Sequence, residues 1–196
     1  MSGKLFIVSA PSGAGKTTLV DEVLGRLRPN YSIDRLVTYT SRAKRDGEED
    51  GKDFHFISSL EFEMKIKNGF FIEWSNEYGH YYGSPSNVKG DLYKGDSKIL
   101  VIDRKGAKQV IEQLSDSILI WIYTKNAAIL RQRLVARGLN TEEQIEARLK
   151  LAKVELEQEA KNPFYRHHIL NDIFDNAANN LELIFLNEFA NFKGNL

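Results

Sequence analysis

The sequence has 196 residues, of which 42% are hydrophobic and 28% are charged, so it can bury a core and stay soluble. Its formal net charge of zero argues against a general nucleic-acid-binding protein, and the lack of cysteine excludes disulfides and thiolate metal sites. No apolar run approaches the roughly 20 residues that a membrane-spanning helix needs, and residues 1–13 show no signal-peptide pattern. We therefore expect a cytoplasmic protein of one domain, with or without inserted lobes, in which any anion site is built from local Arg and Lys side chains.

The first segment with a chemical signature combines a strand, a glycine-rich loop and a helix start. Residues 5–9 are mostly apolar and predict a buried strand, Gly13 and Gly15 lie in the loop, and residues 16–27 carry apolar side chains at helical spacing. This order is typical of a phosphate-binding P-loop, although Ala10 stands where the strict pattern has its first glycine. A chance glycine-rich turn is the alternative, and the correctly placed strand and helix disfavour it.

The P-loop interpretation has a direct physical basis. Glycines allow backbone N–H groups to converge on phosphate oxygens, and a helix N-terminus adds unpaired N–H donors and the positive end of the helix dipole. We expect Lys16 to reach the β- and γ-phosphates of a nucleotide and the Thr17 hydroxyl to be a ligand of Mg²⁺.

The sequence changes character at residues 38–56, which follow a predicted strand over residues 31–39. The stretch is polar and dense in charges of both signs, as a solvated loop would be. Arg42 and Arg45 nevertheless flank one turn, where both guanidinium groups could hold one phosphate. Both interpretations stay open from the residues alone.

A carboxylate then lies inside an apolar strand. A helix is predicted over residues 59–68 and a strand over residues 70–74, in which Glu73 stands between Ile72 and Trp74. A carboxylate in such surroundings either faces solvent or has a partner, so Glu73 is a surface residue or a hydrogen-bond acceptor for a ligand.

Further along, Ser84 is predicted to cap a helix that begins at Pro85. A strand over residues 98–103 ends in Asp103, where P-loop proteins commonly carry an acid that orients Mg²⁺ or a partner at the phosphate site. The remaining expected elements are a helix over residues 104–114, strands over residues 118–123 and 169–171, and a closing helix over residues 176–192. Alternating strands and helices predict βαβ units and a mostly parallel sheet.

Arginines accumulate in the predicted helices near residues 126–160. Arg133 and Arg137 lie one turn apart on a helix that Asn126 caps, and Arg148 lies beside the apolar stripe of the next helix. Residues 141–144 form a capping box at the start of that second helix. The three arginines could close over a nucleotide, or they could be ordinary surface residues.

Together, the segments SAPSGAGKTT, TSRAKRDGEEDGKDFHF, FIEW, HYYGS, RLVARG, ARL and ILND resemble guanylate kinase in their order and separation. The resemblance covers nearly the whole chain. It implies transfer of the γ-phosphoryl group of ATP to GMP, giving ADP and GDP, with Mg²⁺ as cofactor. It also implies an α/β fold with a P-loop NTPase-type core, a parallel β-sheet flanked by helices, a GMP-binding lobe and a helical lid. The implied division is a core of residues 1–34, 88–126 and 161–196, a GMP-binding lobe of residues 35–87 and a lid of residues 127–160.

The same resemblance implies roles for individual residues. The expected ATP-binding residues are Ser12, Gly13, Ala14, Gly15, Lys16, Thr17, Thr18 and Asn171, with Thr17 also on the metal. The expected GMP-binding residues are Thr38, Arg42, Arg45, Glu48, Phe54, Glu73, Tyr82, Ser84 and Asp103. The expected catalytic charges are those of Lys16, Arg42, Arg133, Arg137 and Arg148.

The chemistry of guanine agrees with this assignment. Guanine presents N1–H and N2–H₂ as adjacent donors, and a single carboxylate such as Glu73 accepts both. Adenine would leave that carboxylate unpaired, and sites built around such hydrogen bonds can reject the wrong partner by about 10⁴-fold.

The chain departs from the family pattern at a few positions. Phe54 stands where a tyrosine usually donates its hydroxyl to the GMP phosphate, Val101 replaces an acid, and Arg104 and Lys105 replace an aromatic or apolar residue followed by Gln. Two alternatives therefore remain at this point: a guanylate-kinase-like binding module without catalysis, and a related kinase for a sugar phosphate. The intact P-loop argues against the first, and the combination of Glu73 and Thr38 with the charged loop argues against the second.

Overall fold

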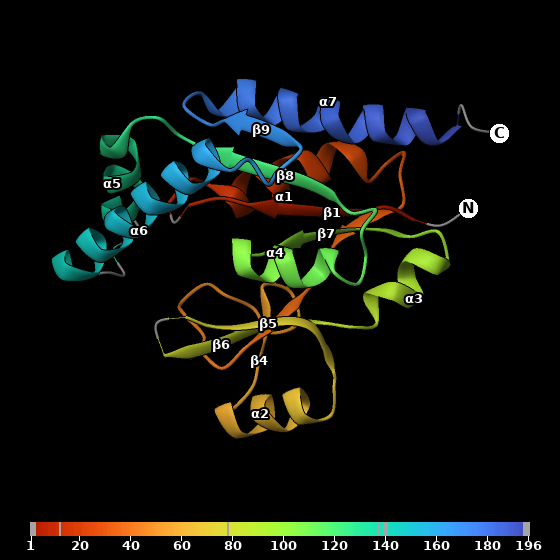
Figure 1. The fold of residues 1–196 in the computed structure, drawn as a ribbon, viewed down its shortest axis with the longest axis horizontal. Coiled ribbons are helices and arrows are strands. Elements are labelled where there is room, and N and C mark those ends of the chain that lie inside the picture. Colours follow the sequence, from red (N-terminus) through yellow and green to blue (C-terminus); the bar gives the residue numbers. More distant parts are fainter. Residues whose placement is uncertain (1–2, 12, 78, 137, 139–140, 194–196) are drawn as a thin grey trace. The chain divides into compact units, whose positions relative to one another are not determined.

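The computed structural model describes residues 3–11, 13–77, 79–136, 138 and 141–193. The chain forms two compact units, which are considered separately. Unit 1 consists of residues 1–7 and 32–118, and unit 2 consists of residues 8–31 and 119–196. Strand β1 (Leu5–Ser9), labelled in Figure 1, begins in unit 1 and ends in unit 2 by residue number.

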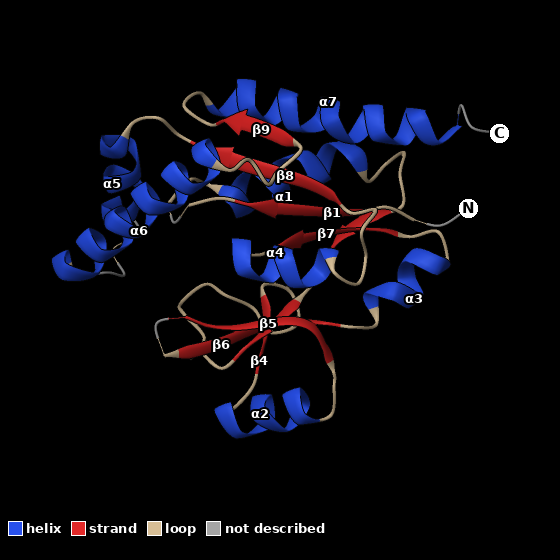
Figure 2. Ribbon diagram, in the orientation of Figure 1, coloured by secondary structure: helices blue, strands red, loops and turns tan. Residues whose placement is uncertain are grey.

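Unit 1 contains strands of two sheets. Its part of the first sheet has the order β2-β7-β1, in which β2 and β7 pair in parallel. The second sheet has the order β4-β3-β6-β5, with β6 antiparallel to both of its neighbours (Figure 2). The elements are β2 (Ile33–Arg35), β3 (Thr38–Thr40), β4 (Phe54–Phe56), α2 (Ser59–Lys67), β5 (Phe71–Glu77), β6 (His80–Pro85), α3 (Val88–Tyr93), β7 (Ser97–Val101) and α4 (Arg104–Ile111).

Local signals explain where α2 and α4 begin. Ser58 and Glu61 form a reciprocal capping box at α2, and Asp103 caps α4 by accepting a hydrogen bond from the Gly106 N–H. Phe62 of α2 is fully buried and stacks on Phe71 of β5, with ring centroids 4.4 Å apart. Helix α2 is thus held against the four-stranded sheet by aromatic packing.

Unit 2 consists of the end of β1, helix α1 and the helices and strands of residues 119–196. Its strand order is β1-β8-β9, and β8 pairs with β9 in parallel. Helix α7 runs along α1, with which it shares buried aliphatic and aromatic side chains (Figure 1). The elements are α1 (Lys16–Leu27), β8 (Ile118–Tyr123), α5 (Ala127–Ala136), α6 (Glu142–Lys161), β9 (His167–Leu170) and α7 (Phe174–Lys193). In the part of the chain that the structure describes, none of the helices is both long and apolar enough to cross a membrane.

Most predicted elements are confirmed, including the capping box of α6, but two predictions are wrong. Residues 31–39 do not form one strand, because β2 and β3 belong to two different sheets. Ser84 and Pro85 do not open a helix; they end β6, and α3 begins only at Val88. The cap signal of Ser84 is overridden because pairing with β5 already engages residues 80–85. The division into core, lobe and lid stays a prediction.

Candidate active site

In unit 2, the loop between β1 and α1 has the conformation expected of a phosphate cradle. Gly13 and Gly15 have φ values of 86° and 83°, a region that side-chain-bearing residues rarely adopt. A Cβ atom on Gly15 would also lie 2.9 Å from the Asn171 amide nitrogen. Gly15 is the N-cap of α1 and makes no side-chain cap. The start of a helix presents N–H groups and the positive end of the helix dipole, which suit an anion.

Two residues predicted from distant segments meet on this loop. Asn171 is 1% exposed and donates from Nδ2 to the Ala14 carbonyl over 2.7 Å. Arg133 donates to the Asn171 carbonyl over 3.0 Å and to the Ala14 carbonyl over 3.4 Å. The predicted ATP-binding residues Ala14 and Asn171 and the predicted catalytic residue Arg133 therefore form one connected cluster.

The other ATP-side residues lie along the same helix start or on α6. Lys16 donates from Nζ to the Ala10 carbonyl over 3.3 Å, so its ammonium group lies folded against the loop. Thr17 and Thr18 are exposed on the first turn of α1, and Arg148 lies half-buried on α6. Predicted Ser12 and Arg137 lie outside the described residues.

In unit 1, Glu73 is the centre of a buried polar cluster. It is 4% exposed and accepts a hydrogen bond of 2.5 Å from the Ser84 hydroxyl, and Ser84 is its direct partner in the β5–β6 pairing. The other oxygen faces α4 at Gly106, where any Cβ would lie 2.5 Å from it. The absence of a side chain at Gly106 is what allows the carboxylate to approach the helix.

A second carboxylate stands beside the first. Asp103 accepts hydrogen bonds from the Ser75 hydroxyl over 3.0 Å and from the Gly106 N–H over 2.7 Å. Burial raises the pKa of Glu73 to about 7; the Asp103 charge adds to the rise, and the Ser84 hydrogen bond opposes it. The cluster therefore offers strong acceptors in a desolvated place, suited to a ligand with adjacent N–H donors.

Thr38 reaches this cluster through strand register. Tyr39 pairs with Gly83 and Thr40 with Tyr82, so the antiparallel register places the buried Thr38 opposite Ser84. Three residues predicted to contact the base thus lie across adjacent strands β3, β6 and β5.

The charged loop after β3 has a defined structure. Arg42 is 8% exposed and donates to both Glu48 oxygens, at 2.7 and 3.0 Å, and to the Ala43 carbonyl at 2.6 Å. Glu48 also accepts the Arg45 backbone N–H over 2.8 Å. Burial would raise the pKa of Glu48, but the Arg42 and Arg45 hydrogen bonds outweigh it and keep this pKa below its usual range. The Arg42–Glu48 pair and the Arg45 N–H therefore give this exposed loop a defined conformation around a buried guanidinium group.

Aromatic side chains flank the Arg42 guanidinium. Its Cζ atom lies 5.6 Å from the ring centroid of Phe54 and 5.7 Å from that of Phe56. Phe54 in turn packs edge-on against Tyr82, with centroids 6.2 Å apart. The structure thus brings Arg42, Arg45, Glu48, Phe54 and Tyr82 together as one group.

Two residues that sequence reasoning missed belong to the Glu73 cluster. Ser75 holds Asp103, and Gly106 gives Glu73 its space. The period of two in a strand places Ser75 on the same face as Glu73, which is a signal that the sequence did contain. Gly106 gave no comparable signal, because its role depends on α4 packing against β5.

Comparisons with known proteins agree with this geometry. A family model described as Guanylate kinase matches residues 2–188. The chain is 42% identical over 186 residues to the guanylate kinase of Fusobacterium nucleatum subsp. nucleatum, which covers 94% of this chain and 97% of that protein. It is 41% identical over 187 residues to the guanylate kinase of Carboxydothermus hydrogenoformans, covering 95% and 89%. The crystal structure of guanylate kinase from Anaplasma phagocytophilum is similar with a TM-score of 0.76 and 29% identity, covering 95% of this chain and 86% of that one. The chain belongs to the guanylate kinase family.

Proposed function

We propose that the chain is a Mg²⁺-dependent, cytoplasmic ATP:GMP phosphotransferase that produces ADP and GDP. The observation that carries this proposal is the joint presence of a glycine-rich loop between β1 and α1 in unit 2 and a buried, hydrogen-bonded carboxylate, Glu73, in unit 1. Membership of the guanylate kinase family supports both substrates.

On the donor side, we propose that the N–H groups of residues 13–18 hold the phosphates of ATP and that Lys16 moves from Ala10 to the β- and γ-phosphates. Asn171 supports an adenine contact nearby. Within the described residues its buried Oδ1 atom has no hydrogen-bond partner, and an exocyclic amino group of adenine would supply one. Arg133, Arg137 and Arg148 are the proposed charges that stabilise the transferring phosphoryl group.

The residues of the P-loop fit a Mg²⁺ ion that is shared with the nucleotide. Thr17 presents an exposed hydroxyl on the turn after Gly15, and Mg²⁺ is usually held by few protein oxygens together with phosphate oxygens and water. No cluster of three or more His, Cys, Asp or Glu side chains that could hold a metal occurs among the described residues. Thr17 is therefore the proposed protein ligand, and bound Mg²⁺ would neutralise phosphate charge during transfer.

On the acceptor side, we propose that Glu73 accepts N1–H and N2–H from guanine, while Ser84 and Thr38 meet the remaining edge of the base. Asp103, which the Ser75 hydroxyl and the Gly106 N–H hold in place, would add a second negative charge beside Glu73. Arg42, Arg45 and Tyr82 hold the phosphate, and Glu48 keeps Arg42 in place. The reaction needs no covalent enzyme intermediate, because a held phosphate oxygen of GMP can attack the γ-phosphorus directly.

The test is steady-state ADP production from ATP and Mg²⁺ with GMP, AMP, CMP or UMP as acceptor. We expect rapid turnover with GMP alone, and we expect Glu73→Gln to raise KM for GMP by about 10²-fold because an ionic acceptor of two hydrogen bonds is lost. Glu112→Gln, an exposed change in the same unit, is the matched control and should leave KM unchanged. A protein that binds GMP but transfers phosphate to none of the four acceptors would overturn the proposal.

A further inference from the structure

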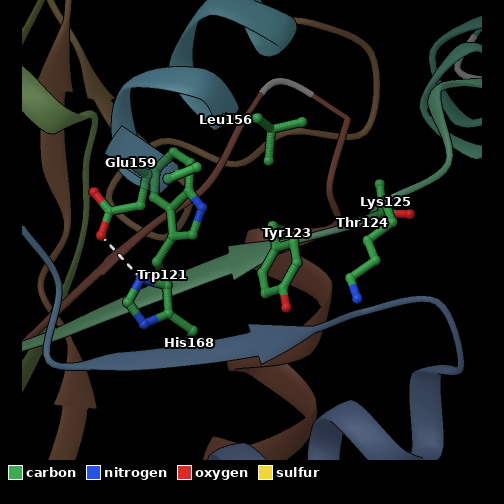
Figure 3. Close-up of a pocket in the computed structure, with 8 residues that line it drawn as sticks. Trp121, Tyr123, Thr124, Lys125, Leu156, Glu159 and His168 are labelled. Atoms are coloured by element: carbon green, nitrogen blue, oxygen red, sulfur yellow. Dashed lines mark hydrogen bonds and ion pairs between the residues drawn. The ribbon is translucent and has the colours of Figure 1, made fainter. Parts of the chain in front are cut away.

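A cavity of about 370 Å³ in unit 2 contains none of the residues assigned to ATP or GMP. It lies between the C-terminal half of α6 and strands β8 and β9 (Figure 3). Its volume is within the range of roughly 300–1,000 Å³ that is typical of small-molecule sites.

One wall of the cavity is aromatic. Trp121 and Tyr123 are two residues apart on β8, so their rings lie on the same side of the strand (Figure 3). Trp121 is 2% exposed and packs on Tyr165 with ring centroids 5.0 Å apart, which fixes the wall from behind. Tyr123 is only half-buried and retains surface for a further ring.

The opposite wall is aliphatic. Leu156 and Ala160 are four residues apart on α6 and therefore share one face of the helix. A flat apolar group placed between them and Tyr123 would bury surface on both of its faces.

The charges around the cavity favour an anionic ligand. Lys125 is exposed at its edge, and among the described residues no carboxylate forms an ion pair with it. The acid of the lining, Glu159, is 4% exposed and is held by hydrogen bonds from the protein itself. One of its oxygens accepts from the Phe164 and Tyr165 N–H groups, at 2.9 and 3.0 Å, and contacts His168 Nε2 at 2.9 Å (Figure 3). The charge left for a ligand is therefore the ammonium group of Lys125.

We propose that this cavity is a binding site for a flat aromatic anion, whose rings lie between Tyr123 and the Leu156–Ala160 face and whose acidic group pairs with Lys125. The acidic group is a carboxylate, sulfonate or phosphate, since each offers the same acceptor oxygens to an ammonium group. Such a ligand contacts α6 and β8 at once and thus stabilises the folded state of unit 2 by mass action.

The probe for the test is 1-anilinonaphthalene-8-sulfonate, titrated into the full chain with the substitution Trp74→Phe. The sequence has two tryptophans, so Trp121 is then the only one, and quenching of its emission reports binding at this wall. We expect saturable one-site quenching and a rise in the thermal midpoint that grows with probe concentration.

Matched variants decide whether the probe occupies the cavity. We expect Lys125→Met to weaken binding about tenfold and Ala160→Phe to abolish it by filling the space. Lys153→Met, an exposed change on α6 outside the cavity, should have no effect. N-phenyl-1-naphthylamine, which lacks the sulfonate, should bind more weakly and be insensitive to Lys125→Met.

Circular dichroism of each variant separates loss of binding from loss of fold, and because Ala160 is exposed the larger side chain need not disturb the core. Equal affinity of the probe for the parent chain, Lys125→Met and Ala160→Phe would overturn the proposal. So would complete displacement of the probe by ATP or GMP, which would place it in the nucleotide sites.

Discussion

The two candidate substrate sites are built from different kinds of groups. In unit 2 the loop between β1 and α1 presents backbone N–H groups, and Lys16 rests on its own loop carbonyl. In unit 1 the site consists of side chains that are already paired with one another, namely Glu73 with Ser84, Asp103 with Ser75 and Arg42 with Glu48. The first site is a local cradle, whereas the second is a network assembled from separate segments.

The difference has a consequence for specificity. A backbone cradle binds any polyphosphate of the right shape, since N–H groups carry no information about the base. A buried carboxylate instead discriminates strongly, because a base without matching donors leaves it desolvated and unpaired. We therefore expect substitutions in unit 2 to act mainly on kcat and those in unit 1 to act mainly on the affinity for GMP.

The largest expected effect belongs to the cradle. Lys16→Met should lower kcat by about 10²–10³-fold, because a charge aimed at the transferring phosphate is removed. Steady-state kinetics with GMP measures this loss. Lys125→Met removes the same charge from an exposed position near β8 and should keep the parental kcat. Equal losses in both variants would show that net charge, and not the P-loop position, matters.

The next effect belongs to the paired network. Glu48→Gln weakens the hold on the nearly buried Arg42 guanidinium, and we expect KM for GMP to rise about 10–100-fold with a lower thermal midpoint. Glu49→Gln is the neighbouring control, since the Glu49 side chain makes an exposed ion pair with Lys52 at 3.4 Å, and such pairs contribute little. If Glu48→Gln leaves KM unchanged, Arg42 does not need its partner to hold the phosphate.

A gain in affinity for GMP is expected at Phe54, where the chain departs from the family pattern within the same group of residues. Phe54→Tyr adds a hydroxyl beside Arg42, and a hydrogen bond to a charged phosphate should lower KM for GMP about tenfold. The measurement is KM at saturating ATP, with the thermal midpoint as a check on folding. An unchanged KM would mean that the hydroxyl does not reach the phosphate from this ring position.

The smallest effect is the contribution of Glu73 to the pH dependence of KM for GMP. Because the pKa of Glu73 is about 7, its carboxyl group is largely protonated at pH 6.5 in the protein without GMP. The N–H groups of guanine bind the ionised carboxylate. Raising the pH from 6.5 to 8 ionises Glu73 and should therefore lower KM for GMP about fourfold. Glu73→Gln keeps the titration of the GMP phosphate and removes that of the carboxylate, so its profile should be flatter. Parallel profiles for the two proteins would assign the dependence to GMP.

The P-loop could be predicted almost completely because its determinants are local. Glycines at 13 and 15, the preceding apolar strand and the following helical period lie within residues 5–27, and the structure confirms each of them. The capping box of α6 is likewise a matter of four consecutive residues. Such features depend on backbone conformation and short-range hydrogen bonds, which residues close together in the sequence determine.

The network around Glu73 could only be suspected from the sequence. Residue type and apolar neighbours marked Glu73 as unusual, but its partner Ser84 was expected to cap a helix. The structure places Ser84 in β6 because strand pairing with β5 outweighs a local capping preference. The same pairing gives Glu73 its hydrogen bond.

The sequence by itself determined the phosphate cradle, the parallel α/β pattern and, through its motifs, the family. The tertiary structure decided which polar side chains face one another: Gly106 opens the space for Glu73, Ser75 holds Asp103, and Arg133 meets Asn171 over Ala14. The physical reason is that local conformation depends on a few adjacent residues, whereas the burial and raised pKa of Glu73 depend on β6 and α4, which pack against it from elsewhere in the chain.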